Sequence, residues 1–186
     1  MRAESFQSTQ EEKVAAYEMI SSTINVWMQE AIQASQEGHQ VMLSSTIRVS
    51  HLIDCLIHGL CGNTFQPNSV DQNTIVICTQ DNLCSLAQLV PDAFEFSSLG
   101  QNKLRQLCAQ LLQNVTANDE LISQPANVLL NIFQSKYQAD QLVPLVLEIL
   151  EDHSRVLRNE PVNPQLCWNA IISSLEMLMV LLKDTI

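Results

Sequence analysis

Basic residues are scarce in this sequence of 186 residues. Lys and Arg together number 9 against 20 Asp and Glu, which gives a formal net charge of −11 at pH 7. Proteins that bind the phosphate backbone of nucleic acids need clustered Lys and Arg, and no such cluster occurs in the sequence. The composition therefore argues against nucleic-acid binding. Through its long-range electrostatic field, the net negative charge weakly favours a basic protein partner.

Long apolar runs are also missing. No uninterrupted run approaches the roughly 18 residues of a membrane span, and LEMLMVLL near the C-terminus is far shorter. The first residues, MRAESFQSTQEEK, contain no apolar segment of signal-peptide length. The six cysteines form no Cys-x-x-Cys pair. We therefore expect an intracellular protein, cytoplasmic or nuclear, that makes no membrane contact and keeps its cysteines as reduced thiols.

Motifs of catalysis and cofactor binding are absent from the sequence as well. It contains no Gly-x-Ser-x-Gly, no Gly-rich phosphate loop and no His-Glu-x-x-His. A nucleophilic pair of Cys108 and His153 could be imagined, but a cysteine on an apolar helical face is normally a small hydrophobic residue. We predict a protein that is not an enzyme and needs no cofactor.

Glycine (4 residues) and proline (6) are few, and most of them lie where helices are expected to begin or end. Thr9-x-x-Glu12 forms a capping box that opens a first helix, which is expected to end by Gly38. Apolar residues at helical spacing predict a second helix over 49–60, ended by Gly62. The same reasoning predicts helices over 101–116, 125–137, 143–158 and 164–183.

Residues 63–73 are expected to form a loop, and the segment after them is ambiguous. Residues 74–79 (TIVICT) are β-branched enough for a strand, whereas Val76, Leu83 and Leu86 recur at helical spacing. With no second strand to pair with it, we prefer a helix that Pro91 ends. The whole chain, 1–186, is thus predicted to be a single all-α domain.

The last helix contains SSLEMLMVLL, which is apolar on too many sides for a free terminal helix. Either it docks centrally, or this chain is one piece of a longer array of helices, and we prefer the second interpretation. Large apolar residues at helical spacing, namely Trp27, Trp168, Met177 and Met179, are expected in the core.

Amides supply most of the polarity, with 19 Gln and 13 Asn in the chain. At about 100° per residue, Gln106, Gln110 and Gln113 lie opposite the apolar face of helix 101–116. A similar ladder occurs on helix 125–137, at Asn127, Asn131 and Gln134. Because an amide both donates and accepts hydrogen bonds, stacked ladders can hold a partner's backbone. The alternative interpretation is a solvated face in a Gln-rich chain.

Two further motifs have alternative interpretations. His51, Cys55 and His58 share one side of a helix with a spacing that could hold zinc, but no fourth ligand can be identified. We prefer a partner-facing surface that includes His51 and His58, and predict no metal. The triplet Asn114-Val115-Thr116 is a glycosylation acceptor motif, but without a secretion signal we interpret Asn114 as satisfying backbone groups where its helix ends.

The segments LCAQLLQNVTAND and LVPLVLEIL resemble parts of an armadillo repeat. In that family a long helix ends in an Asn-Leu-type pair before a polar turn, matched here by Asn114-Val115 and 118–119. A later helix opens with a Leu-Pro-x-Leu-Val-x-x-Leu-like pattern, matched here by 143–147 followed by 149–150. A weaker match to the helix-end pattern is CLIHGLCGN, which has Gly59 in place of the asparagine. The position of the family's groove tryptophan is Gln110 here.

The resemblance implies a right-handed stack of helical hairpins, an armadillo- or HEAT-like α-solenoid fragment. Such a fold implies a scaffold or adaptor that binds a protein or peptide. The residues expected to contact the partner are Gln106, Gln110, Gln113, Asn127, Asn131, Gln134, His51 and His58. The alternative is a structural helical domain that assembles through its C-terminal helix.

Overall fold

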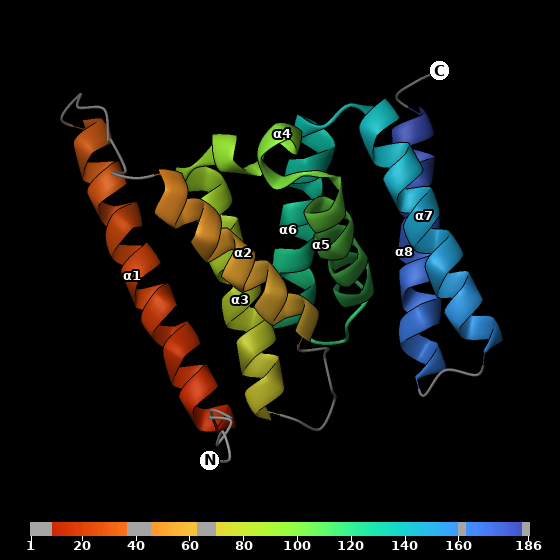
Figure 1. Cartoon of the computed structure of the whole chain (residues 1–186), viewed down its shortest axis with the longest axis horizontal. Helices are drawn as coiled ribbons and strands as arrows, with labels where there is room; N and C mark the ends of the chain where they lie inside the picture. The colour runs from red at the N-terminus through yellow and green to blue at the C-terminus, as the bar shows by residue number, and fades with distance from the viewer. Residues whose placement is uncertain (1–8, 37–45, 63–69, 160–162, 184–186) are drawn as a thin grey trace, which may run out of the picture.

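The computed structural model describes residues 9–36, 46–62, 70–159 and 163–183, which are helical apart from short connections (Figure 1). No strand occurs within these ranges, so the prediction of an all-α chain is confirmed. The elements are α1 (Gln10–Gln36), α2 (Thr46–Gly62), α3 (Val70–Leu89), a 3-10 helix η1 (Pro91–Phe94), α4 (Phe96–Leu99), α5 (Gln101–Asn114), α6 (Glu120–Lys136), α7 (Ala139–Arg158) and α8 (Pro164–Lys183).

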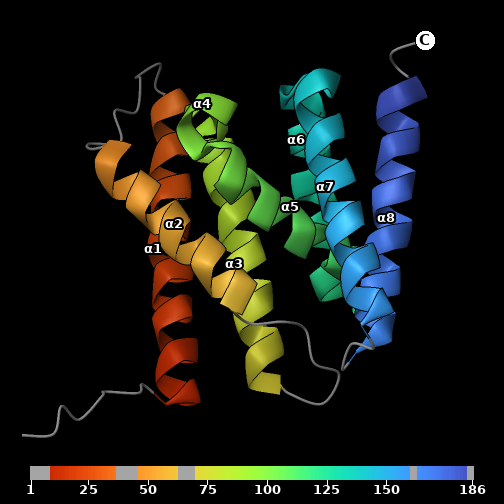
Figure 2. The same cartoon turned by 45° about the vertical axis from the view of Figure 1, so that its right-hand side comes forward.

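The long helices form a row, with α1 at one end and α7 and α8 at the other (Figures 1 and 2). Successive long helices run in opposite directions, and α2 with α3, α5 with α6, and α7 with α8 pack as antiparallel pairs. α5 also contacts α2, α7 and α8, while α3 also contacts α1 and α6. Packing contacts between the pairs, as well as within them, therefore hold the row together.

One cluster of buried side chains extends along the whole row. It begins at Ile24 of α1, includes Leu86 of α3, Leu111 of α5 and Phe133 of α6, and ends at Leu181 of α8. Burying apolar area of this kind is the main favourable term in folding. Because the cluster is continuous, the pairs of helices share a core instead of each forming its own.

Several predicted helix boundaries are confirmed. Thr9 and Glu12 form the capping box: the backbone N–H of Thr9 donates to Glu12 Oε2 (2.8 Å), and that of Glu12 donates to Thr9 Oγ1 (3.3 Å). α2 ends at Gly62, and the ambiguous segment 74–79 is helical within α3, which ends just before Pro91. The predicted stop at Gly38 lies outside the described residues.

The predicted starts of two helices, at 125 and at 143, are wrong, because both positions lie inside longer helices. α6 begins at Glu120, where the side chain of Asp119 accepts a hydrogen bond from the N–H of Leu121 (3.0 Å), so Pro125 lies inside the helix. α7 begins at Ala139, where Gln141 Oε1 accepts from the N–H of Gln138 (3.2 Å). In both helices local capping sets the start, and one missing backbone N–H is tolerated.

Two other expectations need correction. Residues 70–73, expected in a loop, form the first turn of α3, and the rest of that loop lies outside the described residues. Trp168 (50% exposed) and Met179 (70%) face outward from α8, whereas Met177 is buried as predicted. The reason is that α8 packs on α5 and α7 through one side only.

Among the described helices, α8 is the one long and apolar enough to cross a membrane, judged by length and composition alone. No uninterrupted run indicates it, because polar residues, among them Ser173, Ser174 and Glu176, separate its apolar segments. A core helix satisfies the same criterion, and α8 has 44% of its most apolar window buried inside the bundle.

Candidate binding face

Three helices that are not all consecutive, α2, α5 and α7, together form one side of the row, which we call the α2–α5–α7 face. α5 packs between α2 and α7 on this side. A hollow of about 360 Å³ lies between α2 and α5, and another of about 250 Å³ lies between α5 and α7. Cys61 and Gln106 line both hollows, which are therefore adjoining parts of one depression.

The predicted contact residues divide between two places. Gln106, Gln110 and Gln113 of α5 line the hollow next to α7, and His58 lines the one next to α2. His51 is exposed on α2 but is not among the residues that line either hollow. Another set, Asn127, Asn131 and Gln134, lines a separate hollow of about 180 Å³ with residues of α5 and α8. The two amide ladders therefore do not form one continuous surface.

Gln110 does not occupy the exposed position that helical spacing predicted. It is 7% exposed and forms the floor of the hollow, between exposed Gln106 and half-buried Gln113. The prediction failed because α2 and α7 flank α5 on both sides, which leaves only a narrow strip of α5 open to solvent. Gln110 is instead the first member of a buried chain of amides.

The buried amide chain, formed by Gln110, Asn114 and Gln80, connects three helices. Gln110 Nε2 donates to Asn114 Oδ1 (3.3 Å), and Asn114 Nδ2 donates to Gln80 Oε1 (2.7 Å). Gln80 Nε2 in turn donates to the carbonyl of Ile122 (2.8 Å). The chain therefore links α5 to α3 and α6, and it satisfies amide groups that would be costly to bury alone.

The interpretation of Asn114 as a residue that satisfies backbone groups is wrong. The end of α5 is closed by backbone bonds instead, from the N–H of Val115 to the carbonyl of Leu111 (2.9 Å) and from that of Ala117 to the carbonyl of Asn114 (3.0 Å). The Asn114 side chain points inward, is 1% exposed and donates its amide to Gln80. In the folded chain this nitrogen is not accessible for glycosylation.

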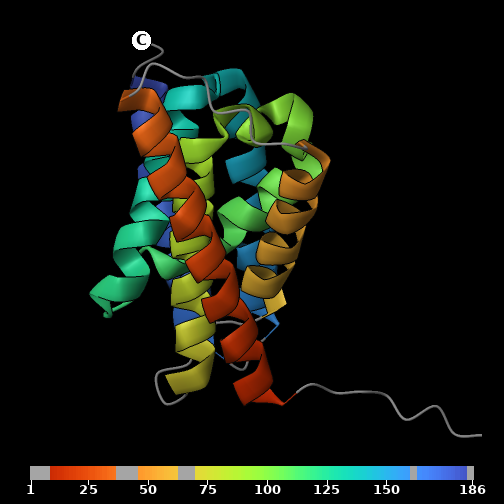
Figure 3. The same ribbon diagram turned by 90° about the vertical axis from the view of Figure 1, so that its left-hand side faces the viewer.

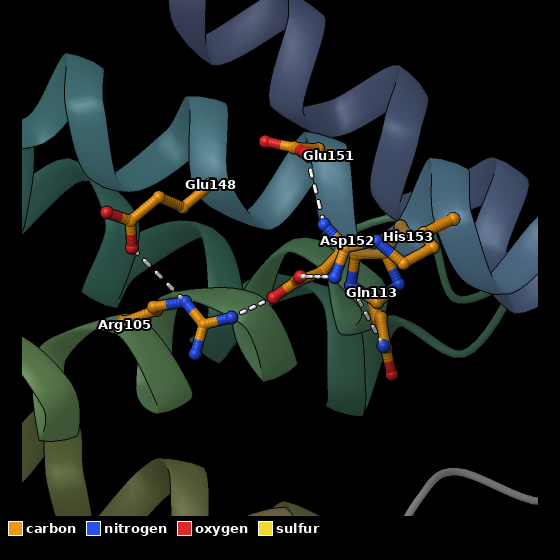
Figure 4. A network of polar contacts seen from close by, with 7 residues as sticks. Arg105, Gln113, Glu148, Glu151, Asp152 and His153 are labelled. Atoms are coloured by element: carbon orange, nitrogen blue, oxygen red, sulfur yellow. Dashed lines mark hydrogen bonds and ion pairs between the residues drawn. The ribbon is translucent and has the colours of Figure 1, made fainter.

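Charged and polar pairs join α5 to the helices beside it, and Figure 4 shows those between α5 and α7. Arg105 of α5 pairs with Asp152 of α7, and its Nε lies 3.5 Å from Glu148 Oε2. On the other side, Lys103 Nζ lies 2.6 Å from Asp54 Oδ1 of α2. Since all these side chains are partly exposed, each pair stabilises the fold only slightly. Their main consequence is that the charges along the depression are largely neutralised.

His153 lies at the α7 wall of the depression, with its Nε2 3.4 Å from Gln113 Nε2. Burial, followed by the nearby Arg105 guanidinium, lowers the pKa of His153 below its ordinary value of 6.5. At neutral pH the ring is uncharged and its Nε2 can accept a hydrogen bond from Gln113. The α7 wall therefore presents a neutral group here.

Replacing Arg105 with Gln is expected to raise the pKa of His153, because it removes a repelling cation from beside the imidazole. It also removes one of the two cations that pair with Asp152, whose other partner, Arg155, remains. An NMR titration of the imidazole C–H signals measures this directly. Because the pKa of His153 is lowered in the folded state, protonation of His153 favours the unfolded chain, so the free energy of unfolding decreases as the pH falls below 6.5. The variant should therefore lose less stability than the parent between pH 7.5 and 5.5. Arg158→Gln, on the exposed last turn of α7, is the control. An unchanged His153 pKa in Arg105→Gln would contradict this assignment.

The cysteines and the possible metal ligands were the candidates for chemical reactivity. Cys108 is fully buried and burial raises its pKa to about 12, so it is a protonated thiol and not a poised nucleophile. All six cysteines are free thiols. Within the described ranges, no group of three or more His, Cys, Asp or Glu side chains is placed to hold a metal ion.

Comparison with known protein families, with curated proteins and with solved structures gave no match. The resemblance to armadillo repeats therefore stays a prediction that depends on the residues quoted for it.

Proposed function

We propose that this chain is a non-enzymatic protein-interaction module, a short armadillo- or HEAT-like α-solenoid that acts as a scaffold or adaptor. It binds an extended segment of a partner protein along the α2–α5–α7 face. The observation that supports this proposal most strongly is the shared depression, in which amides of α5 lie between the walls formed by α2 and α7.

The arrangement of helices supports the solenoid part of the proposal. Three antiparallel pairs, α2 with α3, α5 with α6 and α7 with α8, follow one another along the row (Figure 1). In solenoids each such pair contacts only its neighbours, and equivalent helices line one continuous face. Here α2, α5 and α7 are the first helices of the three pairs, and they line the depression.

The amides on α5 are spaced to bind a peptide backbone. Gln106 and Gln113 are seven residues apart, which on a helix is a rise of about 10.5 Å. Three residues of an extended chain cover about 10 Å, so the two amides can bind peptide groups three residues apart. Within the described residues, the Gln106 side chain makes no hydrogen bond of its own and is exposed, which leaves its donor and acceptor free for a partner.

The depression itself favours neither basic nor acidic partners by its charge, since Lys103 and Arg105 neutralise carboxylates of α2 and α7. A preference for basic partners therefore depends on the net charge of −11 of the whole chain, and not on the depression itself. The proposed compartment is the cytoplasm or nucleus. Asn127, Asn131 and Gln134, on the other side, form no part of this site.

The proposal predicts that Gln106→Arg weakens partner binding at least about tenfold, a loss of roughly 1.4 kcal/mol. The longer cation would occupy the depression beside Arg105 and Lys103 and remove an amide acceptor. Partners are first captured from cell extract with the parent chain and identified, and their affinities for the variants are then measured. Asn131→Arg, at another exposed amide, on α6, is the matched control.

Equal loss of affinity in Gln106→Arg and Asn131→Arg would show that charge alone is responsible. Unchanged affinity in Gln106→Arg would remove the α2–α5–α7 face as the binding site. Circular dichroism of both variants checks that helicity is preserved.

A further inference from the structure

The outer side of α8 carries an apolar stripe that no other described helix covers. Its members are spaced 4, 3, 4 and 3 residues apart, and each is about half exposed or more: Trp168, Ile172, Leu175, Met179 and Leu182. This spacing is that of the seam by which helices pack against one another. A row of large apolar side chains on one face, in place of scattered single residues, is typical of an interaction surface.

The opposite end of the row carries an apolar groove, which we call the α1–α2 groove. Its volume is about 690 Å³, and α1 contributes most of the lining through Ala15, Ala16, Met19, Ile20 and Trp27, with Leu52 from α2. Figure 3 views the molecule from this end, with α1 in front, α2 to its right and α3 behind α1. Small alanines form part of the lining, so the groove is open to large side chains.

The stripe and the groove correspond in length and chemistry. The stripe from Trp168 to Leu182 covers 14 steps of a helix, about 21 Å, and the groove lining from Glu12 to Trp27 covers 15 steps, about 22 Å. One surface is a ridge of large side chains and the other is a hollow bordered by alanines. Each is too apolar to be explained as an ordinary solvated face.

Charge does not oppose their contact, although the chain as a whole is strongly acidic. Glu12 is the one charged residue among those that line the groove, and the stripe itself contains none. Glu176 and Lys183, on the solvent side of α8, carry opposite charges. Repulsion between the remaining carboxylates of two copies is screened beyond about 8 Å at physiological ionic strength.

We infer that copies of this chain associate end to end, with the α8 stripe of one copy seated in the α1–α2 groove of the next. The two surfaces belong to different elements, so the contact is heterologous: each pair leaves one free groove and one free stripe. Association therefore continues beyond the dimer as the concentration rises. The α2–α5–α7 face is not used in this contact and stays available for a partner.

Sedimentation velocity of the full chain over a range of micromolar to near-millimolar concentrations tests the inference. The weight-average mass should rise from the 20.8 kDa of one chain through a series of oligomers. Met179→Glu in the stripe and Ala16→Glu in the groove should each keep the chain at the mass of one copy. Leu121→Glu, an exposed apolar residue of α6 outside both surfaces, should leave the association unchanged.

Mixing the two variants is the decisive step. Met179→Glu has an intact groove and Ala16→Glu has an intact stripe, so an equimolar mixture should form a dimer and no larger species. Circular dichroism of each variant confirms that it is folded.

Three results would overturn the inference. One is a parent chain that stays at 20.8 kDa at every concentration. Another is an Ala16→Glu variant that still dimerises, which would indicate stripe-to-stripe pairing. The third is flotation of the parent chain, but not of Met179→Glu, with phosphatidylcholine vesicles while both remain single chains in solution, since the stripe would then be a lipid-facing surface.

Discussion

Replacing Asn114 with Ala is expected to lower the free energy of unfolding by about 2–4 kcal/mol. The substitution removes a buried side chain and leaves Gln80 Oε1 without its donor, in a position that is 0% exposed to water. Urea unfolding followed by circular dichroism measures the change. Asn131→Ala removes an amide of the same type from the surface of α6, where a change within about 0.5 kcal/mol is expected.

A double-mutant cycle with Gln80→Ala separates the amide chain from simple loss of volume. If Asn114 and Gln80 act as a bonded pair, the double variant should be more stable than the sum of the single effects predicts, by about 1–3 kcal/mol. Strictly additive effects would contradict the hydrogen bond between them. The cycle also tests how α5 is held to α3 and, through Gln80 and Ile122, to α6.

Replacing Gly59 with Ala is expected to destabilise the fold by about 1–3 kcal/mol. The phenol ring of Tyr17 from α1 lies directly on this glycine of α2, so an added Cβ would be 1.7 Å from the Tyr17 hydroxyl oxygen and 2.7 Å from its Cζ. Tyr17 would have to move, which would loosen α1 from α2. Gly62→Ala is the matched control, because no atom lies within 4 Å of a Cβ at that position.

The sign of the Gly59 effect should reverse when the ring is removed. In a Tyr17→Ala background the added methyl group has space, and alanine favours a helix over glycine by up to about 1 kcal/mol. Gly59→Ala should therefore be stabilising in that background, as measured by urea unfolding. If it destabilises both backgrounds equally, contact with Tyr17 is not the reason for glycine at this position.

Local features of the fold were predictable from sequence because they depend on neighbouring residues. The capping box of Thr9 and Glu12 lies within one turn, and the helical spacing of Val76, Leu83 and Leu86 correctly outweighed the β-branched character of 74–79. The starts of α6 and α7 were not predicted, although the sequence contains their capping residues, Asp119 and Gln141. Pro125 and Pro144 lie inside these helices, so proline does not mark the start of either one.

Features that depend on packing between distant segments were not predictable from one sequence. Gln110 matches the pattern of a surface amide, and only the helices on both sides of α5 make it buried. Its connection through Asn114 to Gln80 joins residues 30 positions apart, so no local spacing reveals it. Trp168 has the spacing of a core residue, but α8 has a packing partner on one side only.

The candidate site was predictable in part for the same reason. Helical spacing placed Gln106 and Gln113 on one side of α5, and the structure keeps them together in the depression. Their walls, which include Cys61, Asp152 and His153, come from α2 and α7 and carry no sequence signal that connects them to α5. The second ladder was wrongly joined to the first, because helical spacing says nothing about how two helices face each other.

The most direct measurement of the proposed binding face is photo-crosslinking from single positions in the full chain. A photoreactive phenylalanine analogue is placed at Gln106 in the depression or at Asn131 on the opposite side, and each chain is irradiated in cell extract. We expect a partner identified by capture with the parent chain to be crosslinked from position 106 and not from position 131. Crosslinking of that partner from position 131 alone would contradict it.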